Sequence, residues 1–119
     1  ACGDVAELNN KTVALWMAAV NQGKVAGKNA AGGDVLFEDR EYPAVLNSFG
    51  TRIFSVGEID ESAEVKVIEQ HDVSKEHYKK LFFQQGILKG IVLIGNIVEG
   101  HSLSKGINTI TMDSIDKDV

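Results

Sequence analysis

The feature that most constrains this chain is a series of short apolar and β-branched runs between residues 44 and 94, each bounded by glycine or small polar residues. Such runs, separated by turn-forming residues, are typical of antiparallel strands. The alternating residues Glu64–Val67 fit a strand with one solvent-facing side, and Gln85-Gly86 fits a hairpin turn in which glycine supplies a positive φ. Five strands are expected, at Ala44–Phe49, Arg52–Val56, Glu64–Glu69, Tyr78–Phe83 and Leu88–Ile94.

A long helix is expected before these strands, from Lys11 to about Ala30, with Asn10 or Thr12 capping its first turn. Gly23 and Gly27 lie within this helix, where each glycine costs about 1 kcal/mol relative to alanine. That cost is typical of sites where another backbone packs closely; the alternative is that the second half of the helix is frayed. The apolar residues at helical spacing are Val13, Trp16, Met17 and Val20.

The helix is expected to end at Ala31–Asp34, whose glycines suit a left-handed helix end. Beyond the last strand, Asn96–Ile110 has apolar residues at loosely helical spacing, interrupted by Gly100 and Gly106, which predicts one or two short helices. The order of a long helix, about five antiparallel strands and a short helical segment predicts an α+β architecture.

Composition excludes several classes of protein. With 119 residues the chain has one domain's worth of length, which excludes a two-domain enzyme within it. The formal charge of −5 and the absence of a basic run argue against a nucleic-acid partner or an anionic membrane surface. No apolar stretch approaches the ~20 residues of a membrane span. One cysteine forms no internal disulfide, so a cytoplasmic location is expected.

The residues alone contain no complete active site. No glycine-rich dinucleotide motif, phosphate-binding loop or nucleophile elbow is present. Cys2 has no neighbouring histidine to activate it and is expected to be a small buried side chain. His71, His77 and His101 are too widely spaced to suggest a metal site. His71 and Glu76 have the spacing of an acid-base couple in disulfide reductases, but Asp72 replaces the proline of that motif, which indicates coincidence.

Two groups of residues resemble a known family. Ala1–Glu7 and a set of small and polar residues after it look like the last FAD-binding motif of the two-dinucleotide-fold flavoprotein oxidoreductases. That set is Trp16, Ala19, Gln22-Gly23, Ala26, Asn29 and Gly32. Later segments resemble the C-terminal domain of the NADH-dependent rubredoxin reductase, NADH oxidase and nitrite reductase group. These segments are Ala44–Phe49, Thr51–Gly57, Tyr78–Phe83 and Leu88–Gly95.

The resemblance implies a role at one edge of a flavin. It implies that Asp4, after Gly3, accepts a hydrogen bond from a ribityl hydroxyl of FAD. It also implies that the helix N-terminus faces the flavin pyrimidine edge, with the backbone N–H groups near Thr12 and Val13 close to it and Trp16 nearby. The implied cofactors of the whole protein are FAD and NAD(P)H, and the fragment alone is not expected to retain FAD.

The resemblance also divides the chain. Residues 1–33 correspond to the end of an FAD-binding domain, and residues 34–119 to a C-terminal α+β interface domain. The glycine-rich motifs that grip FAD and NADH are not in this chain, so it is not expected to turn over NADH alone. A start at Ala1 without Met is expected of a piece of a longer protein. The implied partners are the rest of the flavoprotein, an electron-acceptor protein and a second copy of the chain.

Two alternatives remain open at this stage. A cofactor-free interaction or assembly module is compatible with the missing catalytic set, although Ala1–Asp4 would then be an unusual way to begin a domain. A small thiol enzyme built on Cys2 predicts rapid alkylation near neutral pH.

Overall fold

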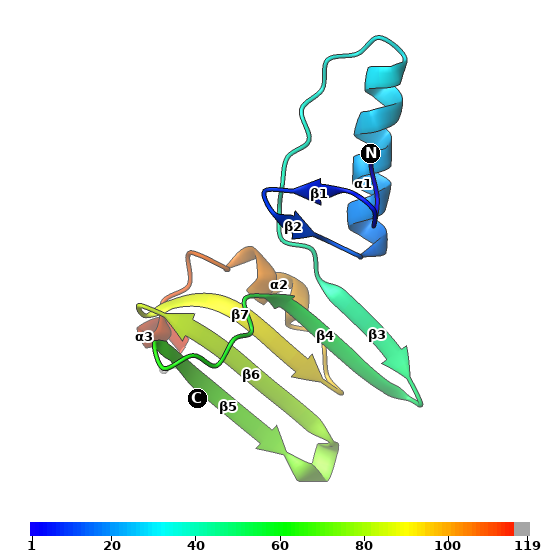
Figure 1. The fold of residues 1–119 in the computed structure, drawn as a ribbon. Helices are drawn as coiled ribbons and strands as arrows, with labels where there is room; N and C mark the ends of the chain where they lie inside the picture. Colours follow the sequence, from blue (N-terminus) through cyan, green and yellow to red (C-terminus); the bar gives the residue numbers. More distant parts are fainter. Residues whose placement is uncertain (116–119) are drawn as a thin grey trace. The chain divides into compact units, whose positions relative to one another are not determined.

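A computed structural model describes residues 1–115 (Figure 1). The chain forms two compact units, Ala1–Tyr42 and a second unit that begins at Pro43. The C-terminal part expected at 34–119 ends in four residues, 116–119, that lie outside the described residues.

The first unit consists of a small hairpin and one helix. Strands β1 (Glu7–Leu8) and β2 (Lys11–Thr12) are antiparallel, and helix α1 (Trp16–Ala30) follows. The helix therefore begins five residues later than the expected start at Lys11. The cause is the turn at Asn9 and Asn10, which have φ values of 52° and 60°. Asparagine tolerates this left-handed conformation, and two such residues in succession close a tight hairpin in place of a first helical turn.

The ends of α1 differ from each other. Leu15, in an extended conformation, occupies the N-cap position and provides no side-chain hydrogen bond. The prediction that Asn10 or Thr12 caps the helix is therefore wrong. After Ala30, Gly32 has a φ of 91°, which confirms the expected left-handed helix end.

The glycines inside α1 do not mark a close approach. Among the described residues, no atom outside the helix's own local backbone lies within 4 Å of a Cβ built on Gly23 or Gly27. The expectation of another backbone packed against them is therefore wrong for these residues.

The second unit contains a five-stranded antiparallel sheet with the order β3-β4-β7-β6-β5 (Figure 1), which confirms the expected strands and the α+β fold. Two of its turns have both central residues at positive φ: Phe49 and Gly50, and Gln85 and Gly86. Turns of this type match the twist of paired strands. The strands are β3 (Ala44–Ser48), β4 (Thr51–Gly57), β5 (Val65–Asp72), β6 (His77–Gln84) and β7 (Ile87–Ile94).

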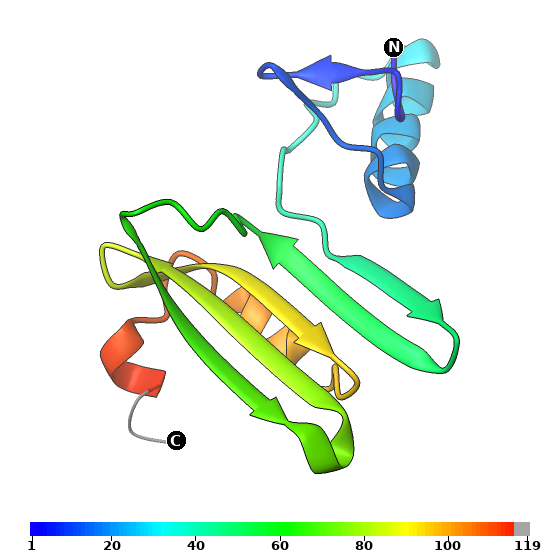
Figure 2. The same ribbon diagram turned by 60° about the horizontal axis from the view of Figure 1, so that its bottom comes forward.

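Short helices cover one face of the sheet (Figure 2). Helix α2 (Gly100–Lys105) starts at a glycine that was expected to interrupt it, because a Cβ on Gly100 would lie 2.8 Å from the Phe54 ring. Helix α3 (Met112–Ile115) follows. The buried core between sheet and helices contains Phe54, Val56, Leu81, Phe83, Leu88, Ile91 and Leu93, with Ile97, Leu103, Ile107, Ile110, Met112 and Ile115 packed against it.

The connection from β4 to β5 passes over the opposite face. Gly57 pairs with Gly90 in the neighbouring strand β7, and the Glu58 N–H donates a 2.9 Å hydrogen bond to the Lys89 carbonyl. A side chain on Gly90 would overlap the Glu58 backbone. Two facing glycines thus provide the space in which the chain leaves β4 and crosses the sheet.

No helix in residues 1–115 combines the length and the apolar character needed to cross a membrane.

Candidate flavin-edge site in the first unit

A hydrogen-bonded turn carries the two residues expected at the flavin. Gly3 has a φ of 79°, and its carbonyl accepts a 2.9 Å hydrogen bond from the Ala6 N–H. The Gly3 N–H donates a 2.6 Å hydrogen bond to Oε1 of Gln22 in α1. A Cβ on Gly3 would lie 3.8 Å from the Ala19 Cβ. The turn with Gly3 and Asp4 is therefore fixed against the first two turns of α1.

The side chain of Asp4 is exposed at the surface of this turn. No described side chain forms a hydrogen bond or ion pair with it. A carboxylate accepts hydrogen bonds and donates none when ionised, so Asp4 is suited to a hydroxyl-rich ligand.

The N-terminus of α1 has no protein cap. Ala19 makes the first intrahelical bond, from its N–H to the Leu15 carbonyl at 3.0 Å, so the N–H groups of Trp16 and Met17 precede the hydrogen-bonded ladder. The first turn contains no acidic residue. In the described part of the chain, the positive end of this helix is thus not neutralised by a side chain, and it favours a ligand atom that carries negative charge.

Apolar side chains surround this helix end. Trp16 is 81% exposed and Met17 is 52% exposed. An exposed tryptophan and methionine beside free backbone donors form a surface that suits a flat ligand with a polar edge.

The other expected site residues lie in the hairpin and the segment after it. Thr12 ends β2, and Val13 lies between β2 and α1, so their N–H groups are not at the helix N-terminus as expected. Trp16, which was expected near the ligand, is the first residue of the helix. The role of Gln22 in holding the turn was not predicted. Gln22, 19 residues after Gly3, is one of the residues that carry the family resemblance, and that resemblance was the available signal.

Cys2 is exposed, so its expectation as a buried side chain is wrong. It lines a cavity of about 240 Å³ between the N-terminal segment and α1. The lining residues include Glu7, Gln22 and Asn29 but no histidine, lysine or arginine that would stabilise a thiolate. The cavity therefore gives the thiol no means of activation.

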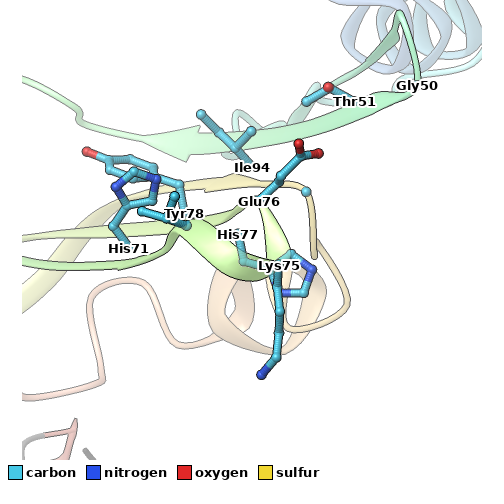
Figure 3. A pocket seen from close by; sticks show the side chains of 10 residues that line it. Gly50, Thr51, His71, Lys75, Glu76, His77, Tyr78 and Ile94 are labelled. Atoms are coloured by element: carbon cyan, nitrogen blue, oxygen red, sulfur yellow. The ribbon is translucent and has the colours of Figure 1, made fainter.

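A separate open cleft lies at one end of the sheet in the second unit (Figure 3). His71 and Glu76 both line it. His71 packs edge-on against Tyr78, with ring centroids 5.8 Å apart, whereas Lys75 and His77 point away from Glu76 in Figure 3. The polar groups of the cleft diverge, so they do not form an acid-base pair. In residues 1–115, no three potential ligand side chains cluster as a metal site.

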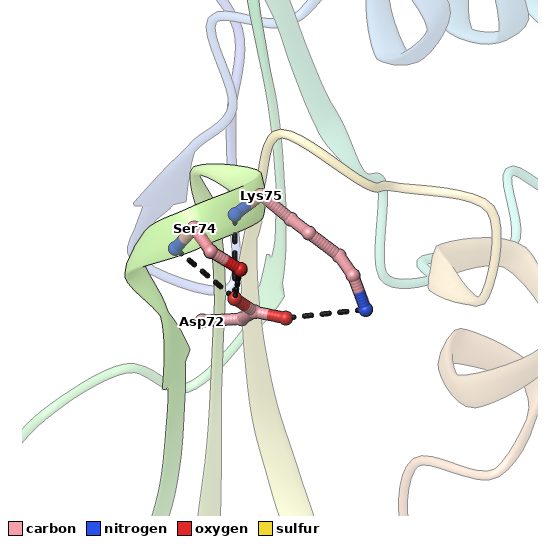
Figure 4. A network of polar contacts seen from close by, with 3 residues as sticks. All are labelled: Asp72, Ser74 and Lys75. Carbon is pink, nitrogen blue, oxygen red and sulfur yellow. Dashed lines mark hydrogen bonds and ion pairs between the residues drawn. The ribbon is translucent and has the colours of Figure 1, made fainter.

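Asp72 organises the turn next to this cleft (Figure 4). Its Oδ1 accepts hydrogen bonds from the Ser74 hydroxyl at 2.6 Å and from the Ser74 and Lys75 N–H groups at 3.1 and 3.3 Å. These bonds, led by the Ser74 hydroxyl, lower the pKa of Asp72 from 3.8 to about 2. The network stabilises the connection between β5 and β6 and has the geometry of a helix cap.

Lys80 ties the β4–β5 connection to the sheet. Its ammonium group bonds to Glu61, lies 3.9 Å from Glu69 and lies 5.5 Å from the centre of the Phe82 ring. The hydrogen bond with Glu61 is the main cause that raises the pKa of Lys80 above its usual value of 10.5. This contact holds the β4–β5 connection, called the crossover below, against the sheet. No ligand is needed to explain it.

Comparison with known proteins identifies relatives over nearly the whole chain. The chain is 31% identical over 109 residues to the NADH-rubredoxin oxidoreductase of Clostridium acetobutylicum, a match that covers 92% of this chain and 28% of that protein. It is 31% identical over 104 residues to the nitrite reductase [NAD(P)H] of Bacillus subtilis, covering 87% of this chain and 13% of that protein. The chain thus spans about a quarter or less of the length of these relatives.

A solved structure has a fold similar to that of this chain. The crystal structure of NADH:rubredoxin oxidoreductase from Clostridium acetobutylicum matches 99% of this chain and 32% of its own, with a TM-score of 0.77 and 29% identity. The model of the rubredoxin NAD+ reductase C-terminal domain matches residues 43–111, which is more than half of the chain. The chain therefore belongs to the rubredoxin NAD+ reductase C-terminal domain family.

Proposed function

We propose that this chain is the C-terminal part of an FAD-dependent NAD(P)H oxidoreductase, in which the first unit supplies one edge of the flavin site. Residues 1–33 then complete an FAD-binding domain, and residues 34–119 form an interface domain. The observation that carries this proposal is the turn of Gly3 and Asp4, hydrogen-bonded through Gln22 to a helix whose N-terminus has no cap.

The residues present fit an isoalloxazine and its ribityl chain. Asp4 offers an exposed carboxylate to a ribityl hydroxyl, and the N–H groups of Trp16 and Met17 offer donors to the pyrimidine edge. Thr12 and Val13, which precede this helix in the chain, are also proposed to lie near the flavin edge. When bound, FAD would supply the chemistry of hydride acceptance from a nicotinamide and of onward electron transfer. The chain's own residues orient the ring edge and favour negative charge on it.

The proposed partners are the rest of the flavoprotein and an electron-acceptor protein. Rubredoxin is the acceptor that the name of the clostridial relative gives. We propose a cytoplasmic location, because a single cysteine suits a reducing compartment.

The test uses the protein that contains this chain, with Asp4→Asn compared with Asp34→Asn. Asp34 is also an exposed aspartate of the first unit, but it lies beyond the end of α1. Since a hydrogen bond to a charged group contributes about 1.5–3 kcal/mol, Asp4→Asn is expected to weaken FAD binding about tenfold or more. Flavin content and a fluorescence titration measure it. Equal FAD affinity in both variants would contradict the role of Asp4.

Hydrogen exchange of the protein that contains this chain gives a second readout, with the protein measured before and after FAD is added. Added FAD is expected to slow exchange of the Trp16 and Met17 amides and to leave the amides of β6 unchanged. The alternative candidate, a cofactor-free assembly module, is favoured by the exposed and uncharged strand β3 and predicts no change at either place.

A further inference from the structure

The first turn of the chain and helix α1 are separate segments that carry different parts of the proposed flavin site. Asp4 lies in the turn, whereas the N–H groups of Trp16 and Met17 belong to the first residues of the helix. The connection through residues 7–15 contains the β1–β2 hairpin and a short stretch without regular structure. The position of the carboxylate relative to the helix N-terminus therefore depends on what holds the turn against the helix.

One side chain of α1 holds this turn. Oε1 of Gln22, in the second turn of the helix, accepts the 2.6 Å hydrogen bond from the Gly3 N–H. Within residues 1–115, no other hydrogen bond joins residues 1–6 to α1. Gln22 is half-buried, and partial exclusion of water strengthens a hydrogen bond.

The packing around Gly3 brings its N–H within reach of this acceptor. Ala19 and Gln22 are three residues apart, so they are neighbours on one face of α1. A Cβ on Gly3 would lie 3.8 Å from the Ala19 Cβ, so two small residues allow the turn to approach the helix beside Gln22. The Gly3 carbonyl accepts a 2.9 Å hydrogen bond from the Ala6 N–H. Both backbone polar groups of Gly3 are thus bonded, which restricts the place of Asp4, the next residue.

We propose that Gln22 is a positioning residue for FAD, which sets the place of the Asp4 carboxylate relative to the N-terminus of α1. The inference rests on the proposed function. It adds that the contact of Asp4 with the ribityl chain depends on a side chain in the second turn of the helix. Gln22 acts through Asp4, and its amide accepts the backbone N–H without placing a second negative charge on the turn.

A double-mutant cycle in the protein that contains this chain tests this coupling. Gln22→Met keeps the length of the side chain and removes the acceptor. Loss of one neutral hydrogen bond is expected to raise the Kd of FAD about 3–10-fold in a fluorescence titration. In an Asp4→Ala background the same change is expected to alter the Kd less than about twofold, because the group that Gln22 positions is already absent. The same cycle with Gln22→Leu repeats the test with a second apolar side chain.

Two control variants separate positioning from a general effect on the helix. Gln22→Glu keeps an acceptor oxygen, so its Kd for FAD is expected to lie closer to that of the wild type than to that of Gln22→Met. Asn21→Leu removes the neighbouring amide of α1, whose Nδ2 donates a 3.4 Å hydrogen bond to the Tyr42 hydroxyl. It is expected to leave the Kd unchanged, because this bond does not involve the turn.

The cycle distinguishes failure of this inference from failure of the proposed function. An equal rise of the Kd with and without the Asp4 side chain would give Gln22 a general structural role and overturn the inference. An unchanged Kd in both Gln22→Met and Gln22→Leu would overturn it as well. If Asp4→Ala alone binds FAD as tightly as the wild type, the role of Asp4 in the proposed function is contradicted, and the role of Gln22 is contradicted with it.

Discussion

A side chain on Gly90 would overlap the carbonyl oxygen of Glu58, because the chain that leaves β4 lies directly against the backbone of β7. The next closest atom to such a Cβ, apart from the Glu58 backbone, is Cγ2 of Ile59 at 3.3 Å. Gly90 is buried and pairs with Gly57 on one side and with Phe82 on the other. The crossover and the sheet therefore depend on a position without a side chain.

Gly90→Ala is expected to destabilise the second unit by about 1–3 kcal/mol, the usual cost of overpacking a filled site. Urea denaturation followed by the circular dichroism of the sheet measures it. The variant is also expected to accelerate amide exchange at Glu58, whose N–H bonds to the Lys89 carbonyl. A free energy of unfolding within about 0.5 kcal/mol of the wild type would show that the crossover moves aside at little cost.

Gly23→Ala is expected to stabilise the protein, whereas Gly90→Ala is expected to destabilise it. Among residues 1–115, no atom outside the helix's own nearby backbone lies within 4 Å of the added methyl group, and alanine in a helix interior is favoured over glycine by about 0.5–1 kcal/mol. The stability of α1 is expected to rise by this amount, measured as slower exchange of its amides. A loss of stability in this variant would reveal a neighbour of Gly23 in solution.

Gln22→Leu is expected to release the turn that carries Asp4. The change removes the acceptor of the Gly3 N–H, and a hydrogen bond of this kind contributes about 0.5–1.5 kcal/mol. Exchange of the Gly3 amide is expected to accelerate up to about tenfold. Gln22→Glu keeps an acceptor oxygen and is the control, with Gly3 exchange close to that of the wild type. Equal exchange in the leucine and glutamate variants would rule out a stabilising role for this bond.

The carboxyl group of Asp72 is expected to titrate near pH 2 in an NMR titration. Its folded pKa lies below its usual value of 3.8, so its contribution to stability is complete above about pH 4 and is lost as the pH falls through 2. Ser74→Ala removes the main cause of the shift and is expected to move the midpoint toward 3.8. Asp72→Asn is expected to remove this part of the acid dependence. A midpoint near 3.8 in the wild type would show that the turn does not form this network in solution.

The sheet was predictable because its signals are local. Gln85-Gly86 forms a turn with positive φ at both residues, and the flanking apolar runs supply two adjacent strands. The α+β fold follows from such segments alone. The strand order could not be predicted from the sequence. The pairing of β4 with β7 brings Gly57 and Gly90 together, and the close backbone contacts at these glycines are visible only in the folded structure.

The candidate site was predictable in part. The turn of Gly3 and Asp4 and the helix after it came from a resemblance, and Trp16 does begin that helix. The helix start was misplaced because apolar spacing extends back to Val13, although the Asn9-Asn10 pair favours a turn. The hydrogen bond between Gln22 and Gly3 joins positions far apart in the sequence, and no local pattern shows it.

The order of the strands in the sheet predicts an order of folding. The β3–β4 hairpin and the β5–β6–β7 meander each join strands that are consecutive in the chain, so each forms from local contacts. Strands β5 and β6 lie between β4 and β7 in the sequence, so the pairing of β4 with β7 closes a longer loop and costs more entropy. We therefore expect the meander to be complete in the transition state and the hairpin to dock late, so that changes in β3 alter the unfolding rate more than the folding rate.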